Sequence, residues 1–269
     1  MPSPSRALQD CTDTDRNFTA YQNRFTMNGE ENNAGRTNFW YSFDFGLAHF
    51  ISLNGETDFA YSPEWPFVRD LSGNETLPKE NETFSTDSGP FGYINGSWKD
   101  NKAYEQYQWL AKDLASIDRK KTPWVFAMSH RPMYSSEVAS YQKNVRNAWE
   151  ELMLEHGVDA YFAGHIHWYE RLFPLGNNTI DHSSIKSNNT YLTNPGISMT
   201  HIVNGAAGNI ESHSTLPANE TLPITNVLNQ KDYGFGKLTV NSATQASWQW
   251  IKGVDGSVGD KLTLLKRGH

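Results

Sequence analysis

The chain has 269 residues, 37% of them hydrophobic, and nine Trp, twelve Tyr and fourteen Phe residues supply material for a core. This length suits one large domain or two small ones. The formal net charge of −7 argues against nucleic acid or an anionic membrane surface as a partner. No apolar run reaches a membrane-spanning length, and residues 1–6 contain none of the apolar stretch that marks a signal peptide. GxSxG, P-loop and dinucleotide-binding motifs are missing, so serine hydrolase, kinase and oxidoreductase readings have no support.

The first part of the chain predicts a hairpin, a long excursion and a helix. Residues 38–44 and 48–53 have the composition of two strands joined by a tight turn. Residues 54–100 are rich in Gly, Pro and Asn and are longer than an idle loop in a compact domain. Apolar side chains between residues 107 and 117 then follow helical spacing, and Pro123 limits the helix.

A strand–helix–strand unit follows. Residues 124–129 and 158–163 are apolar runs of strand length, and residues 145–156 between them carry an amphipathic helical pattern that Gly157 closes. A connection of this kind joins parallel strands. The first two thirds of the chain therefore indicate an α/β fold.

The last third of the chain predicts antiparallel strands. Residues 233–240 and 246–251 alternate between apolar and polar side chains, and we expect them to form a second sheet packed on the first. Residues 253–269 end in basic residues and are interpreted as a mobile tail.

Three histidines stand at the ends of the two buried strands. His130 follows residues 124–129, and His165 and His167 follow residues 158–163. Functional groups collect at the carboxyl ends of strands in α/β proteins, and imidazole is a ligand for Zn, Fe, Mn and Cu. The pattern predicts a metal site, although a histidine at a strand end is also compatible with an ordinary hydrogen-bonded role.

The residues around these histidines resemble two motifs of one enzyme family. The segment Gly164–Arg171 resembles the last metal-ligand motif of the purple acid phosphatases, a branch of the calcineurin-like metallophosphoesterases, and Ser129–Tyr134 resembles the motif before it. Fungal members are most similar, and the resemblance runs in order from about Cys11 to about Gly253. The further segments that carry it are residues 17–22, 39–44, 87–92 and 208–211.

Three other motifs of that family are missing from the chain. GDxG, GDxxY and GNHE carry the bridging aspartate, the iron-bound tyrosine, an asparagine ligand and a catalytic histidine, and none of them occurs in the sequence. We therefore expect the C-terminal half of a phosphatase that starts at an internal or mis-assigned Met1. The fold class that the resemblance implies is α/β, a two-sheet αββα sandwich without its N-terminal half. Residues 1–252 would be the C-terminal portion of that domain, with residues 190–252 as its C-terminal subdomain and 253–269 as the tail.

The resemblance implies an acid phosphatase that hydrolyses small phosphate monoesters with Fe(III) and a divalent Zn, Mn or Fe ion. By motif position, His130 and His165 would bind the divalent ion, and His167 the Fe(III). Because the bridging aspartate is missing, we expect at most one metal ion in this chain and assign no catalytic residue to it. The alternative is an inactive fragment or a degenerate metal-binding or interaction module. Two roles are open for the residues that follow the HxH pair. They line or brace the site, or they form an ordinary strand-exit salt bridge. These residues are Tyr169, Glu170 and Arg171.

Two further histidines and the sequons complete the expectations. We expect His49 to be a structural, hydrogen-bonded residue, and His213 follows a glycine-rich turn that resembles a site-proximal loop of the family. Cys11 is the single cysteine; either its partner lies in residues that precede this chain, or Cys11 is a free thiol without a role. Seven N-glycosylation sequons and the family suggest a glycoprotein that is secreted or located in the cell wall or vacuole. The sequons begin at Asn17, Asn74, Asn81, Asn95, Asn177, Asn188 and Asn219.

Overall fold

A computed structural model describes most of the chain from residue 40 onward. The described residues are 24, 25, 27, 40–55, 84–87, 93–96, 102–137, 143–208, 210 and 212–268. Cys11 and the sequons at Asn17, Asn74 and Asn81 lie outside them. Within the predicted excursion, the described part includes an antiparallel pair of strands, β3 (Phe84–Asp87) and β4 (Tyr93–Gly96).

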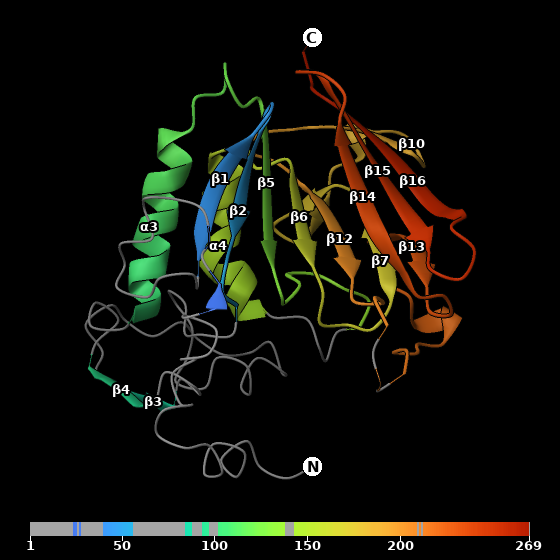
Figure 1. Cartoon of the computed structure of the whole chain (residues 1–269), viewed down its shortest axis with the longest axis horizontal. Helices are drawn as coiled ribbons and strands as arrows, with labels where there is room; N and C mark the ends of the chain where they lie inside the picture. The colour runs from blue at the N-terminus through green and yellow to red at the C-terminus, as the bar shows by residue number, and fades with distance from the viewer. Residues whose placement is uncertain are drawn as a thin grey trace.

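The larger sheet has seven strands in the order β1-β2-β5-β6-β12-β7-β13 (Figure 1). β2, β5, β6 and β12 run parallel, and β1, β7 and β13 are antiparallel to their neighbours. β1 and β2 form the predicted hairpin. The strands are β1 (Tyr41–Phe45), β2 (Ala48–Ser52), β5 (Trp124–Ser129), β6 (Ala160–Ala163), β12 (Thr200–Asn204), β7 (Tyr169–Leu172) and β13 (Thr225–Asn229).

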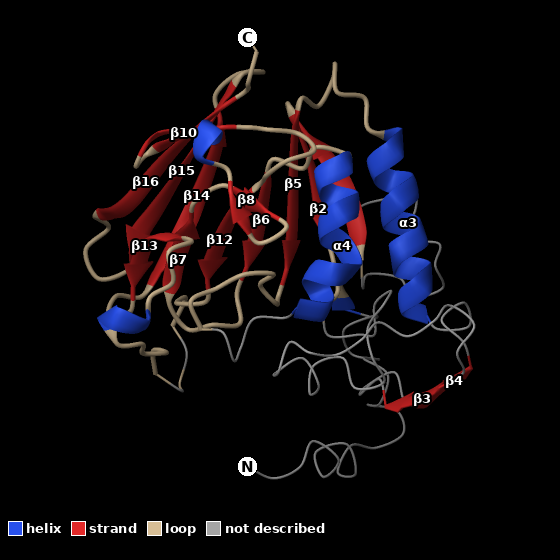
Figure 2. Ribbon diagram, turned by 180° about the vertical axis from the view of Figure 1, so that it is seen from behind, coloured by secondary structure: helices blue, strands red, loops and turns tan. Residues whose placement is uncertain are grey.

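Two helices cover one face of this sheet (Figure 2). α3 (Lys102–Ser116) contributes Leu110 and α4 (Lys143–Glu155) contributes Trp149 to a core that also contains Val125 of β5. Both helices were expected from their apolar spacing, and the β5–α4–β6 unit is parallel as predicted. Gly157 has a φ of +67°, a left-handed conformation that favours glycine and ends α4.

The opposite face of the larger sheet packs against a second sheet of five strands in the order β10-β11-β16-β15-β14. Phe126 and Tyr169 from the larger sheet meet Trp248 and Leu262 from the smaller one in a shared apolar core. The strands of the smaller sheet are β10 (Ile185–Ser187), β11 (Thr190–Leu192), β16 (Val258–Leu265), β15 (Gln245–Lys252) and β14 (Gly234–Val240). Short elements complete the described part: β8 (Leu175–Gly176), β9 (Thr179–Ile180) and the 3-10 helices η3 (His182–Ser184) and η4 (Ala218–Glu220).

The molecule is thus an α/β sandwich of two sheets, which confirms the predicted fold class. α3 and α4 both lie on the larger sheet, so neither forms the second helical layer of the expected αββα arrangement. The proposed subdomain boundary near residue 190 stays a prediction. In the described ranges, no helix is long and apolar enough to cross a membrane.

The interpretation of residues 253–269 as a mobile tail is wrong. Residues 258–265 form β16, which pairs with β15 on one side and with β11 on the other. Asp260, Leu262 and Leu264 are buried against the larger sheet at alternate positions, as the two-residue period of a strand requires. The basic residues at the end of the chain favoured an exposed tail, but the alternating buried positions of residues 260–264 are those of a strand.

His49 is a structural residue, as expected. Its Nδ1 lies 2.6 Å from Asp44 Oδ1 and its Nε2 lies 3.0 Å from Asp113 Oδ2, so it connects β2 to β1 and to α3. His201 lies inside β12 and is buried. Its ring stands edge-on to Tyr134 with 5.0 Å between the ring centroids.

Candidate functional site

The two predicted strand ends meet at one edge of the larger sheet. β5 and β6 are adjacent and parallel, with Ser129 opposite Ala163, so the residues that follow them leave the sheet side by side. A backbone hydrogen bond of 3.0 Å from Gly164 N–H to the His130 carbonyl joins the two exits. The carboxyl ends of these strands therefore present His130 and His165 next to each other.

His130 and His165 are in direct contact. His165 Nδ1 lies 3.2 Å from His130 Nε2, and the two rings meet edge to face with 5.1 Å between centroids. The other ring nitrogen of His165, Nε2, lies 2.9 Å from an Nη1 atom of Arg131. His165 also has a φ of +61°, a conformation that is rare outside glycine and collects at functional sites.

The surroundings keep the His165 imidazole neutral. Burial, and after it the neighbouring groups Arg131, His130 and His167, lower the pKa of His165 to about 4. A guanidinium only donates hydrogen bonds, so Nε2 accepts from Arg131 and Nδ1–H donates to His130 Nε2. A neutral imidazole is the form that binds a metal ion.

His167 is held through its backbone by residues 213 and 214. Its N–H donates to Ser214 Oγ over 3.2 Å, and its carbonyl accepts from Ser214 N–H over 3.2 Å and from His213 Nδ1 over 3.1 Å. The backbone of Gly205 also packs closely against this segment. A side chain at position 205 would place its Cβ 1.9 Å from the Ile166 carbonyl oxygen. Glycine is therefore required at position 205.

The three predicted ligands do not form one cluster. His130 and His165 touch, but in the described part of the chain no group of three or more His, Cys, Asp or Glu side chains is arranged to hold a metal ion. The described residues therefore offer part of one metal site, the His130–His165 pair, and no complete ligand set. Imidazole nitrogens alone suit a divalent transition metal.

Tyr169 and Arg171 belong to the sheet-to-sheet scaffold. The Tyr169 hydroxyl and the Arg171 guanidinium both donate to Asp260 of β16, with Tyr169 Oη and Arg171 Nε each 2.6 Å from Asp260 Oδ2. Burial and the Asp260 carboxylate raise the pKa of Tyr169 well above its usual value. The salt-bridge interpretation therefore applies to Arg171, and its partner lies in the strand that was interpreted as a tail.

Glu170 points to the opposite side of β7 and organises a nearby loop. Its carboxylate accepts hydrogen bonds from Ser135 Oγ at 2.6 Å, Ser136 N–H at 3.0 Å and Trp168 Nε1 at 3.1 Å. The Thr225 hydroxyl also donates to it. Glu170 thus braces the loop that follows His130 and the segment that follows His167, which is a supporting role for the site.

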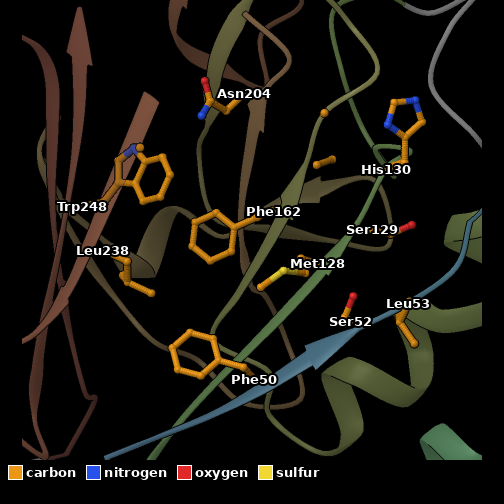
Figure 3. A pocket seen from close by; sticks show the side chains of 13 residues that line it. Phe50, Ser52, Leu53, Met128, Ser129, His130, Phe162, Asn204, Leu238 and Trp248 are labelled. Carbon is orange, nitrogen blue, oxygen red and sulfur yellow. The ribbon is translucent and has the colours of Figure 1, made fainter. Parts of the chain in front are cut away.

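An apolar cleft between the two sheets leads to His130 (Figure 3). Its volume is about 520 Å³. Phe50, Phe162 and Trp248 form its walls, and Asn204 and His130 lie toward one end.

Arg131 and Asp260 are the residues that sequence analysis missed. Arg131 lies inside the Ser129–Tyr134 motif, next to His130, so its position was available as a signal. The sequence gives no comparable indication that Asp260 pairs with Arg171, because that contact joins strands 89 residues apart.

Two family descriptions match this chain. Residues 14–169 match the calcineurin-like phosphoesterases, and residues 198–261 match the family described as iron/zinc purple acid phosphatase-like protein C. An acid phosphatase of Aspergillus ficuum is 60% identical over 270 residues, which cover 100% of this chain and 44% of that protein. Acid phosphatase A of Cryphonectria parasitica is 30% identical and covers 95% of this chain and 48% of that one.

A solved structure gives the same result. The purple acid phosphatase from yellow lupin (Lupinus luteus) seeds superposes with a TM-score of 0.65 at 25% identity, covering 91% of this chain and 35% of that one. The match over residues 14–169, more than half of the chain, shows that the chain belongs to the calcineurin-like phosphoesterases. Within that class, the chain belongs to the purple acid phosphatase family, as the resemblance implied. It spans less than half the length of the curated relatives it matches.

Proposed function

We propose that this chain is the histidine-bearing part of an acid phosphatase that hydrolyses small phosphate monoesters. The observation that carries the proposal is the contact between His130 and His165, which stand 3.2 Å apart at adjacent strand ends, with His165 kept neutral. The fungal acid phosphatase that is 60% identical supports the same activity.

In this proposal His130 and His165 hold a divalent Zn, Mn or Fe ion, and His167 contributes to an Fe(III) ion. When bound, such metals supply a water-derived nucleophile and neutralise charge on the phosphoryl oxygens. The chain itself supplies the geometry. Gly164 N–H fixes the His130 carbonyl, Arg131 and His130 orient the His165 ring, and Ser214 fixes the backbone of His167.

A second candidate is an inactive fragment or a degenerate metal-binding or interaction module. The observation that favours it is the lack of any three-ligand group among the described residues, together with the missing GDxG, GDxxY and GNHE motifs. Such a chain would bind one metal ion and would not turn over a phosphate ester.

We also propose that the protein is a secreted, N-glycosylated phosphatase. Asn177, Asn188 and Asn219 are exposed in the structure, which N-glycosylation requires. Asn177 has a φ of +49° and Asn178 one of +60° at the tip of the β8–β9 hairpin, a position open to a glycan. Asn95 lies in β4.

The decisive experiment combines metal counting with a chromogenic phosphate monoester assay at acid pH. It compares the 269-residue chain, a protein extended by the missing three motifs, and His130→Ala and His165→Ala variants of each. The proposal expects activity in the extended protein that either substitution abolishes, with His182→Ala as the matched control because His182 is exposed in η3. An extended protein that is inactive, or whose activity survives His165→Ala, would favour the second candidate.

A further inference from the structure

Two basic side chains share one buried carboxylate at the amino ends of β5 and β6, the end of the larger sheet opposite to His130 (Figure 1). Lys266 Nζ lies 2.5 Å from Asp159 Oδ1, and Arg119 Nη1 lies 3.7 Å from Asp159 Oδ2. The Val125 N–H donates to the same Oδ2 over 2.8 Å, so the carboxylate is fixed at the start of the two strands. Lys266 belongs to the basic chain end that was interpreted as a tail.

The two cations are held in place by different parts of the fold. Arg119 donates to the carbonyls of Pro123 over 3.2 Å and Gly157 over 2.7 Å, which connects the start of β5 to the end of α4. The ammonium group of Lys266 lies 4.3 Å from the centre of the Trp124 ring, in a cation–π contact. An ammonium group has three N–H donors, and the carboxylate accepts from one of them. Among the described residues no second acceptor bonds to this group.

A hollow of about 340 Å³ opens beside this cluster, and Arg119 and Lys266 both line it. Its volume falls in the range of small-molecule binding sites. Glu155 lies at its rim, exposed, and within the described ranges it forms no ion pair with either cation. The uncharged part of the wall consists of Pro123, Gly157, Pro195 and Ala243.

The cluster holds more positive than negative charge, since two cations face one carboxylate. Burial lowers the pKa of Lys266 and of Arg119 and raises the pKa of Asp159, so the protein interior disfavours all three charges. A charge that is removed from water requires a partner of opposite sign. An anion in the hollow would supply the missing negative charge.

We propose that this hollow is a binding site for a small oxyanion, held between Lys266 and Arg119. The ligand carries a sulfate, phosphate or carboxylate group, whose oxygens accept from the N–H donors of Lys266 that Asp159 does not use. The site is separate from the strand-end histidines and does not depend on the proposed phosphatase activity.

The test is isothermal titration calorimetry of the full 269-residue chain with sulfate and, separately, with succinate, at constant ionic strength. Lys266→Met removes a cation and should lower the affinity for the bound anion about tenfold or more. Asp159→Asn removes the neighbouring negative charge and should raise that affinity about tenfold. Both substitutions break the same ion pair, so a purely structural effect would have the same sign in both variants.

A surface variant keeps the test independent of substitutions in the interior. Glu155→Gln removes a negative charge at the rim of the hollow without breaking an ion pair among the described residues, and it should raise the anion affinity about threefold. Glu151→Gln is the matched control, because Glu151 is also exposed on α4 and does not line the hollow. The two variants have the same net charge, and Glu151→Gln should leave the affinity unchanged.

Each other outcome decides the matter as well. No binding of either probe by the parent chain would overturn the inference. So would equal effects of the two glutamate substitutions, or changes in the same direction for Lys266→Met and Asp159→Asn. Binding of one probe alone supports the site and assigns it to tetrahedral anions or to carboxylates. If binding survives Lys266→Met but is lost in His165→Ala, the anion occupies the histidine site and the inference fails.

Discussion

Arg171 of β7 and Asp260 of β16 form a bidentate ion pair that joins the two sheets. Arg171 Nε lies 2.6 Å from Asp260 Oδ2, and Arg171 Nη2 lies 2.9 Å from Asp260 Oδ1. Arg171 is fully buried, and its Nη1 donates to the Tyr191 hydroxyl of β11 over 2.6 Å. Three strands of two sheets thus meet at one guanidinium, directly after the segment that carries His165 and His167.

We expect Arg171→Met to destabilise the protein strongly. Removing one partner of a buried ion pair leaves the other charge without compensation, which costs about 3–5 kcal/mol. Urea unfolding of the variant should show this loss, with Asp260→Asn in a similar range. Lys252→Met is the control, because the Lys252–Asp232 pair of 2.8 Å lies at the surface and should change the midpoint little. If Arg171→Met had normal stability but lost Zn²⁺ affinity, Arg171 would instead support the metal site directly.

His49 should make the stability of the protein depend on pH. Burial opposes protonation of His49, but hydrogen bonds to Asp113 and then Asp44 outweigh it and raise the pKa of His49 above 6.5. A raised pKa in the folded state adds stability below pH 6.5, and this stability is lost as pH rises through the folded pKa. Replacing His49 with Gln should therefore lower the urea midpoint more at about pH 5 than at about pH 8.

His201 gives the opposite sign and serves as the contrast. Burial lowers the pKa of His201 to about 3, so the folded protein keeps it neutral while the unfolded chain protonates below pH 6.5. Wild-type stability is therefore reduced as pH falls below 6.5, and His201→Asn should remove that part of the acid sensitivity. Equal pH profiles for the His49 and His201 variants would contradict both assignments.

Local patterns in the sequence predicted most of the fold. The apolar runs at residues 124–129 and 158–163 became β5 and β6, and the stripes between Tyr107 and Ile117 and around Trp149 became α3 and α4. These signals are local, because a strand or a helix repeats its burial every few residues. β16 was not predicted. Its apolar residues Leu262 and Leu264 alternate with polar ones, but this pattern is short and charged residues follow it directly.

The part of the candidate site that lies at strand ends was predictable from the sequence. The meeting of His130 and His165 follows from two parallel neighbouring strands, which sequence indicates. The partners of Tyr169, Glu170 and Arg171 do not follow, because Asp260 and Thr225 reach them from strands far away in the chain. Contacts of this kind depend on sheet packing, and no local pattern encodes them.

The metal content of the purified chain should be one ion or less. His130 and His165 provide a pair of imidazoles, and the described residues contain no complete ligand set. Mass spectrometry of metals after dialysis against Zn²⁺ and iron checks this expectation, and the preparation should show no purple colour. His165→Ala should remove the bound ion, and His182→Ala should retain it. Two tightly bound ions per chain would mean that residues outside the described ranges complete the site.

We expect the side chain of His213 to help hold the backbone of His167 in place. Its Nδ1 lies 3.1 Å from the His167 carbonyl, and its ring stacks on Tyr233 with 4.1 Å between centroids. Tyr233 is anchored in turn, because its carbonyl accepts from Gly253 N–H over 2.8 Å. His213 therefore connects the smaller sheet to the backbone of a predicted iron ligand.

Removal of this connection should weaken metal binding through His167 without unfolding the protein. In the protein extended by the missing motifs, His213→Ala should lower the iron content, and His213→Asn should restore much of it, because an amide N–H can donate to the same carbonyl. A lost hydrogen bond of this kind costs about 1 kcal/mol, which corresponds to roughly a fivefold change in affinity. The control is Tyr233→Phe, which keeps the ring that stacks on His213. Equal iron content in His213→Ala and the parent protein would show that Ser214 alone fixes His167.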